Sequence, residues 1–165
     1  MESSLIVTEK EIQDFLENAR DNQEASMKKV EQINELQERM IEDIREQAKR
    51  LTPVFRFLKE HKHVFVDEFS GRSHTKGPVL NYDARNNELY FYCIESESFK
   101  KITLYDESKP ATVINPRMIL RVIEYEKIMI NLSRHLEYYS RFIQECDETI
   151  QNWTNLRRKF APEFN

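Results

Sequence analysis

Residues 118–153 carry a heptad seam, a row of side chains spaced alternately four and three residues apart. All eleven positions are apolar or amphipathic: Met118, Val122, Tyr125, Met129, Leu132, Leu136, Tyr139, Ile143, Cys146, Ile150 and Trp153. Because 39% of the chain is hydrophobic, such a run arises by chance from about 1 in 30,000 starting points. The seam predicts a long helix that packs along another helix.

A second, more diluted seam lies nearer the N-terminus. Thr8 and Glu11 have the spacing of a capping box, in which a hydroxyl and a carboxylate each bond a free amide at a helix start. The 4-3 count then continues, with polar or small interruptions, as far as Leu58. Thr52-Pro53 predicts a kink or a break, because proline lacks an amide donor and clashes with the preceding turn. We therefore expect a flexible N-terminus over 1–7 and a long helix over 8–61 with a kink at Pro53.

Residues 62–114 predict a small antiparallel β-sheet. Four short segments rich in β-branched and aromatic residues are separated by turn formers, at 63–67, 79–82, 88–94 and 99–105. The last three are joined by short connections, so we expect them to form an antiparallel meander. Asn115-Pro116 then has the sequence of a helix start. It predicts a long heptad helix over 115–160, followed by a tail over 161–165.

The two predicted helices have similar lengths, about 70 Å and about 65 Å at 1.5 Å per residue. With a small sheet between them, the simplest arrangement is a helical hairpin in which residue 58 lies near 118 and residue 16 near 160. We therefore expect an α+β fold, with two long antiparallel coiled-coil helices flanking a small antiparallel β-meander at one end. Beside its seam the second helix carries further apolar residues. These predict a homo-oligomer interface that includes Ile123, Ile130 and Phe142.

The sequence contains no recognisable catalytic or cofactor pattern. We find no nucleophile with an orienting base, no phosphate-binding glycine loop and no convincing cysteine-histidine spacing for a metal. No apolar stretch approaches the ~20 residues that span a bilayer, and the N-terminus does not read as a signal peptide. Cys93 and Cys146 are expected as small core residues rather than a disulfide pair. We therefore expect a cytoplasmic non-enzyme without cofactor, metal or membrane contact.

The predicted sheet offers a candidate surface for binding a protein partner. Alternation along 88–94 places Leu89, Phe91 and Cys93 on one face. The opposite face is also apolar or aromatic, and the glycine-containing loop over 71–77 adds cationic residues at its edge. Since tyrosines are enriched at interfaces, we predict a partner-binding surface made of Tyr82, Tyr90, Tyr92, Tyr105, Arg72, His74 and Lys76. The alternative is that this face is covered by the helix over 53–61 or by a partner subunit.

We expect the protein to be a non-enzymatic interaction module. The helices would form a coiled-coil scaffold, and the predicted sheet over 62–114, called the β tip below, would carry the binding surface. The protein would serve as an adaptor, an assembly subunit or an inhibitor of the kind carried by phages and mobile elements. The alternative is a nucleic-acid-associated regulator that uses a basic cluster where the first helix meets the sheet. That cluster consists of Lys49, Arg50, Arg56, Lys59 and Lys62. A net charge of −4 for the whole chain argues against this alternative.

Overall fold

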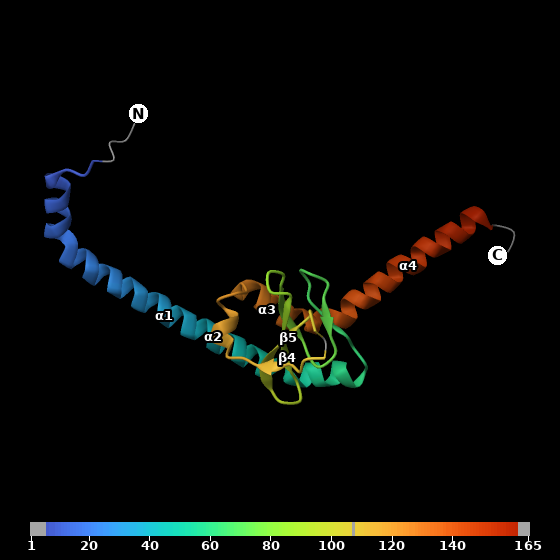
Figure 1. The fold of residues 1–165 in the computed structure, drawn as a ribbon. Helices are drawn as coiled ribbons and strands as arrows, with labels where there is room; N and C mark the ends of the chain where they lie inside the picture. Colours follow the sequence, from blue (N-terminus) through green and yellow to red (C-terminus); the bar gives the residue numbers. More distant parts are fainter. Residues whose placement is uncertain (1–5, 107, 162–165) are drawn as a thin grey trace. The chain divides into compact units, whose positions relative to one another are not determined.

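The fold mixes long helices with a small antiparallel sheet (Figure 1). The computed structural model describes residues 6–106 and 108–161; most of the predicted flexible N-terminus and tail lies outside them. The described elements are α1 (Glu9–Glu60), β1 (Phe65–Val66), β2 (Ser73–His74), β3 (Val79–Asp83), β4 (Glu88–Cys93), β5 (Ser98–Thr103), β6 (Thr112–Val113), α2 (Pro116–Ile119), α3 (Tyr125–Ser133), the 3-10 helix η1 (Arg134–Glu137) and α4 (Tyr138–Phe160). The chain divides into two compact units, 1–42 and 43–165. Within the first unit the described secondary structure is the N-terminal part of α1.

The N-terminus of α1 confirms the predicted capping box. The amide of Thr8 donates to Oε2 of Glu11 at 2.7 Å, and the amide of Glu11 donates to Oγ1 of Thr8 at 3.3 Å. Hydrogen bonds from the backbone and the hydroxyl of Thr8 favour the charged carboxylate, and they lower the pKa of Glu11. Two amides that the first turn leaves without helical partners are thereby satisfied.

At its other end α1 continues through Pro53 to Glu60, so a break at this proline is ruled out. The hydroxyl of Thr52 donates to the carbonyl of Ala48 at 2.9 Å. Proline removes the amide that would bond the carbonyl of Lys49. Both Pro53 and Lys49 are exposed, so water can satisfy the freed carbonyl and the helix tolerates the proline.

The predicted meander is confirmed and is one strand larger than expected. A four-stranded antiparallel sheet has the order β3-β4-β5-β6, and β1 with β2 forms a separate hairpin. The connections after β3 and β4 turn at Asn87 and Glu97, whose φ angles are 51° and 47°. β2 and β6 were not predicted, because each has only two residues and two residues carry no alternation.

The predicted continuous helix over 115–160 is wrong. Asn115 caps α2 through a hydrogen bond to the amide of Arg117, as expected, but α2 ends at Ile119 and α3 starts only at Tyr125. A 3-10 segment then separates α3 from α4. The interruption places the side chains of Ile119 and Ile123, which are 0% and 7% exposed, in the hydrophobic core. Turn hydrogen bonds, such as the one from the amide of Ile123 to the carbonyl of Ile119 at 2.8 Å, keep part of the backbone bonded across the interruption.

The core lies between the C-terminal half of α1, the meander and α3 (Figure 1). Its members lie in α1, β1, β3, β4, β5, α2 and α3 or directly beside them: Ile44, Ala48, Leu51, Phe55, Leu58, Phe65, Leu80, Tyr90, Tyr92, Ile94, Phe99, Ile119, Ile123, Ile128 and Leu132. The apolar seam of α1 is therefore buried over 44–58, but it packs against the sheet and α3.

Within unit 43–165 the helices do not form the predicted antiparallel hairpin. The hydroxyl of Tyr125 donates to Asp43 at 3.0 Å, and Gln47 bonds Ser133 at 3.2 Å. Further along, the rings of Phe57 and Tyr139 lie 6.3 Å apart. These three contacts ascend together in both segments, so residues 125–139 follow α1 in the parallel direction. The seam spacing predicts packing against a helix but carries no information on direction.

Candidate functional site

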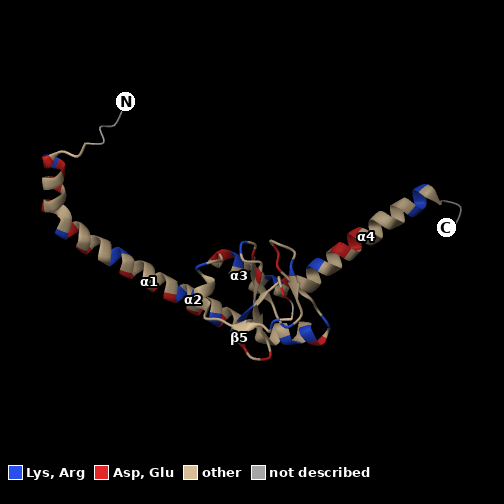
Figure 2. Cartoon of the chain, viewed as in Figure 1, with Lys and Arg blue, Asp and Glu red and all other residues tan. Residues whose placement is uncertain are grey.

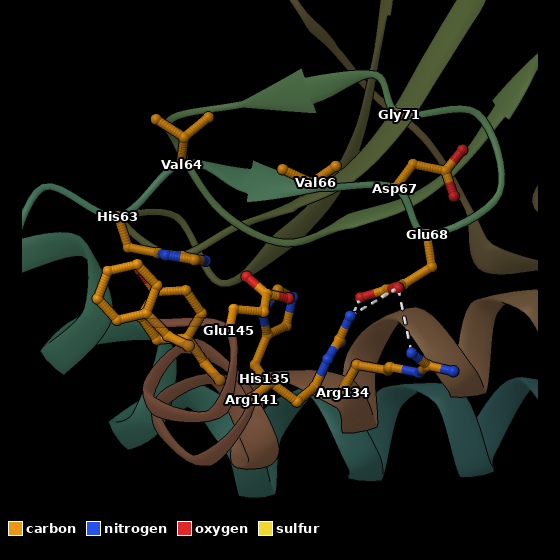
Figure 3. Close-up of a pocket in the computed structure, with 12 residues that line it drawn as sticks. His63, Val64, Val66, Asp67, Glu68, Gly71, Arg134, His135, Arg141 and Glu145 are labelled. Carbon is orange, nitrogen blue, oxygen red and sulfur yellow. Dashed lines mark hydrogen bonds and ion pairs between the residues drawn. The ribbon is translucent and has the colours of Figure 1, made fainter. Parts of the chain in front are cut away.

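A pocket lined by many charged and titratable residues lies between the β1–β2 hairpin and the start of α4 (Figure 3). Its volume is about 310 Å³. Apolar side chains of Val64, Val66 and Phe142 line part of it, and charged or titratable groups line the remainder: His63, Asp67, Glu68, Arg134, His135, Tyr138, Arg141 and Glu145. The question is whether these polar groups are available to a ligand or are already engaged with each other.

Asp67 is fully buried and holds the loop of the hairpin. Its carboxylate accepts hydrogen bonds from the amides of Phe69 and Ser70 at 3.3 and 3.2 Å, and from the hydroxyl of Ser70. The side-chain amide of Asn131 on α3 adds a further bond at 2.7 Å. A buried carboxylate is stable only when it is bonded in this way. Asp67 is therefore a structural residue that fastens the loop to α3.

Asn131 is the centre of this network, because it bonds three separate segments. Its Nδ2 donates to Asp67 and to the carbonyl of Leu80 at 2.7 and 2.8 Å, and its Oδ1 accepts from the amide of Glu68 at 3.0 Å. The side chain is 1% exposed. One buried amide thus joins α3, β3 and the loop after β1. Sequence reasoning missed this residue, since a lone asparagine in an apolar helix carries no recognisable spacing.

Glu68 lies between two arginines at the rim of the pocket (Figure 3). Its oxygens are 2.8 Å from Arg141 and 3.2 Å from Arg134. The hydrogen bond from Arg141 is the main reason that the pKa of Glu68 is lowered. Since these side chains are partly exposed, each ion pair contributes at most about 1 kcal/mol. Their role is to hold the hairpin against η1 and α4.

His135 lies at the buried end of the pocket, 9% exposed. Its ring packs edge-on against Phe55 and Phe65, at centroid distances of 5.5 and 5.2 Å, and His63 lies 5.8 Å away. Burial lowers its pKa to about 4, and burial also lowers the pKa of His63. Both rings are therefore neutral at pH 7, and Nε2 of His135 is buried without a partner.

These contacts favour a structural interpretation of the pocket over a catalytic one. Two of the three carboxylates that line it are engaged: Asp67 is bonded to Asn131 and to its own loop, and Glu68 is bonded to Arg141 and Arg134. A general base needs a proton acceptor that points at a substrate position, and the engaged carboxylates offer none. Among the described residues, no group of three histidine, cysteine, aspartate or glutamate side chains is arranged to hold a metal ion.

The predicted partner-binding surface on the sheet needs correction at its centre. Tyr90 and Tyr92 are each 4% exposed and belong to the hydrophobic core. The ring of Tyr92 packs on Phe55 of α1, and its hydroxyl lies 3.2 Å from the hydroxyl of Thr52. Both faces of β4 are apolar because each is covered within the same chain. The alternative in which the helix over 53–61 covers the tyrosine face is therefore the one observed.

The other residues assigned to that surface are only partly brought together. The guanidinium of Arg72 lies 5.0 Å from the ring centre of Tyr82. His74 stacks on Phe91 at 3.9 Å, and its Nδ1 accepts from the amide of Lys76. Tyr105, beyond the end of β5, is 76% exposed. The loop over 71–77 therefore has local contacts with the sheet. The expected interface lacks its centre, because Tyr90 and Tyr92 are buried.

The expected oligomer interface is corrected at Ile123, which is 7% exposed and packs in the core of its own chain. Ile130 is partly buried and lines a shallow hollow with Tyr125 and Met129. Phe142 is 50% exposed. Of the three residues, Phe142 on α4 is the one that lies mostly on the surface.

Much of the basic cluster proposed for nucleic acid is neutralised by neighbouring acids. Arg56 pairs with Glu97 at 2.6 Å, and Lys59 pairs with Glu95 at 2.7 Å. A third pair joins Arg50 to Glu46 at 2.6 Å on the helix surface. In the described part of the chain, Lys49 and Lys62 are the two exposed members of the cluster that make no ion pair. A cluster that alternates with acids does not form the positive stripe that phosphates require.

The most exposed apolar surface of unit 43–165 lies on α4. Three members of the predicted seam, Ile143, Ile150 and Trp153, are 58%, 62% and 68% exposed, and Phe160, seven residues beyond Trp153, is 73% exposed. Monomeric proteins rarely leave such a row uncovered, and rows of this kind usually mark an interface. The N-terminal part of α1, described by itself, also exposes apolar side chains at Ile12, Phe15, Leu16, Val30, Ile33 and Leu36.

The chain was compared with protein-family models, with curated proteins and with solved structures, and none of the three comparisons finds a match. No helix in the described ranges combines the length and the apolar character that crossing a membrane requires. The candidate site therefore rests on the geometry of this chain alone.

Proposed function

We propose that the protein is a non-enzymatic interaction module that binds another protein chain through the exposed face of α4. The observation that carries the proposal is the uncovered row on this helix, in which Trp153 is 68% and Ile150 is 62% exposed. Removing such side chains from water is the main driving force of most protein association. Tryptophan is also strongly enriched among residues that dominate binding energy.

The remainder of unit 43–165 is suited to support such a helix. Its core is continuous from α1 through the meander to α3. The start of α4 is fixed by the ion pairs of Arg141 with Glu68 and by ring contacts of Tyr138 with His63, at a centroid distance of 4.3 Å. A helix that is anchored at its first turns and exposed beyond them presents its apolar row to other molecules. This proposal keeps the predicted class of function and moves the binding surface from the β tip to the helix.

A photo-crosslinking experiment on the whole chain tests the proposal. A photo-reactive phenylalanine analogue is placed at position 153 in one variant and at position 148, on the opposite side of α4, in a matched control. We expect covalent adducts to protein from position 153 and few from Glu148, which is exposed but polar. If neither position yields adducts in cells, or both yield the same adducts equally, α4 is not a binding face and the proposal is wrong.

A further inference from the structure

The exposed row on α4 has the spacing of a short coiled coil. The positions 143, 146, 150, 153, 157 and 160 follow the alternation of three and four residues, and Arg157 is the one charged member. Ile143 and Phe160 stand at the ends, and Cys146 is the most covered of the set. These 18 residues span about 27 Å at 1.5 Å per residue. The segment needs a helix of similar length to cover it.

Charge is distributed unevenly along this segment. Glu145, Asp147 and Glu148 lie in its first half, and Arg157, Arg158 and Lys159 lie in its last turn (Figure 2). If two copies of α4 paired in parallel, acids would lie next to acids and bases next to bases. In an antiparallel pair the acidic half of each copy meets the basic end of the other. Like charges at such short distances destabilise association, whereas opposite charges favour it.

The register of an antiparallel pair follows from the seam. The seam has two kinds of position, those followed by a step of three residues and those followed by a step of four. In an antiparallel coiled coil each kind lies opposite the other, so Cys146 lies opposite position 157 and Ile150 lies opposite position 153. Ile143 then meets Phe160, and every seam position in 143–160 has a partner. A shift to the next register places Asp147 next to Asp147 of the other copy. It also brings Phe160 against Leu136 in η1, beside the anchored part of the helix.

We propose that α4 pairs with α4 of a second copy of the chain, in an antiparallel coiled coil with Cys146 opposite Arg157. This inference rests on the proposed function and names the protein that covers the exposed row. In this arrangement Trp153 packs against Ile150 of the other copy, and the arginine at 157 lies next to Asp147. The contact is short, so we expect reversible association.

Cysteine cross-linking on the full chain tests the direction and the register, because Cys146 lies in the seam. Cys93 is 3% exposed and serves as a common background. We expect the Arg157→Cys variant to form a cross-linked dimer of twice 19.9 kDa with an oxidant or a short thiol cross-linker, through Cys146 and the new cysteine. The wild type and the variant Cys146→Ser, Arg157→Cys are expected to give little cross-linking.

The opposite pattern overturns the proposal. Cross-linking of the wild type through Cys146, or of the double variant through position 157, indicates a parallel pair or a different register. A monomer of 19.9 kDa for the wild type at about 100 μM in sedimentation velocity also overturns it, since the apolar row would then lack even weak self-affinity. In that case photo-adducts between position 153 and another protein would still support the proposed function. Failure of the α4–α4 pairing can thus be distinguished from failure of α4 as a binding face.

Charge exchange gives a second test that does not depend on cysteine chemistry. Replacing Glu145 and Asp147 by lysine is expected to weaken dimerisation at least about tenfold, and replacing Arg157, Arg158 and Lys159 by glutamate is expected to do the same. Combining both sets in one chain restores opposite charges across an antiparallel pair and should recover the dimer. Circular dichroism checks that each variant remains helical. If the combined variant stays as weak as the single sets, the charge argument for the antiparallel pair is wrong.

Discussion

Replacing His135 by phenylalanine should remove a large part of the acid sensitivity of the fold. The ring is 9% exposed and already packs edge-on against Phe55 and Phe65. Nε2 is buried without a partner, so a phenyl ring of similar shape loses no hydrogen bond at that atom. We expect the free energy of unfolding of His135→Phe at pH 7.5 to lie within about 1 kcal/mol of wild type, as for other substitutions that conserve volume.

The magnitude of the pH effect follows from the pKa difference between the two states. Burial lowers the pKa of His135 to about 4 in the folded chain, against about 6.5 when unfolded. The unfolded chain therefore binds the proton more readily between these values. The stability that the neutral ring permits is fully present above pH 6.5 and is lost as the pH falls toward 4. Between pH 7 and pH 5 the wild type should lose about 2 kcal/mol through this residue alone.

Urea unfolding at pH 7, 6 and 5 measures this loss, and the difference between wild type and His135→Phe isolates it. His63 lies 5.8 Å from His135, and burial lowers its pKa as well, so it adds acid sensitivity in both proteins. The lowered pKa of Glu68 acts at lower pH, and it is also common to both. His61→Phe is the matched control, because that ring is exposed. A variant that keeps the wild-type slope to within about 0.5 kcal/mol would refute the reasoning.

Two further substitutions test the assignment of buried residues. Tyr92→Ala should cost about 4 kcal/mol, because it removes a core ring and the hydroxyl contact with Thr52, whereas Tyr105→Ala should change stability by less than about 0.5 kcal/mol. Equal urea midpoints for the two variants would argue that Tyr92 is not in the core. Asn131→Leu should cost about 4 kcal/mol, since it leaves Asp67, the carbonyl of Leu80 and an amide without their buried partner. A loss below about 1 kcal/mol, by the same measurement, would show that this network is dispensable.

The parts of the fold that local chemistry determines were predictable from the sequence. The capping box at Thr8 and the meander over 79–103 depend on residues close in the chain, and both are present. The break between α2 and α3 depends instead on where the sheet lies, because it positions Ile119 and Ile123 in the core. Local propensity favours a continuous helix there, and tertiary packing overrides it.

The location of the binding surface could not be predicted for a related reason. Alternation along β4 shows that both faces carry apolar side chains, but not which molecule covers them, and Tyr90 and Tyr92 proved to be covered by their own chain. The same ambiguity applies to the heptad seam. Its members in α3 pack inside the unit, where Leu132 is 0% exposed, while Ile150 and Trp153 in α4 are uncovered. A periodic pattern specifies that a face will be buried, and the uncovered part of the seam is what a partner chain must cover.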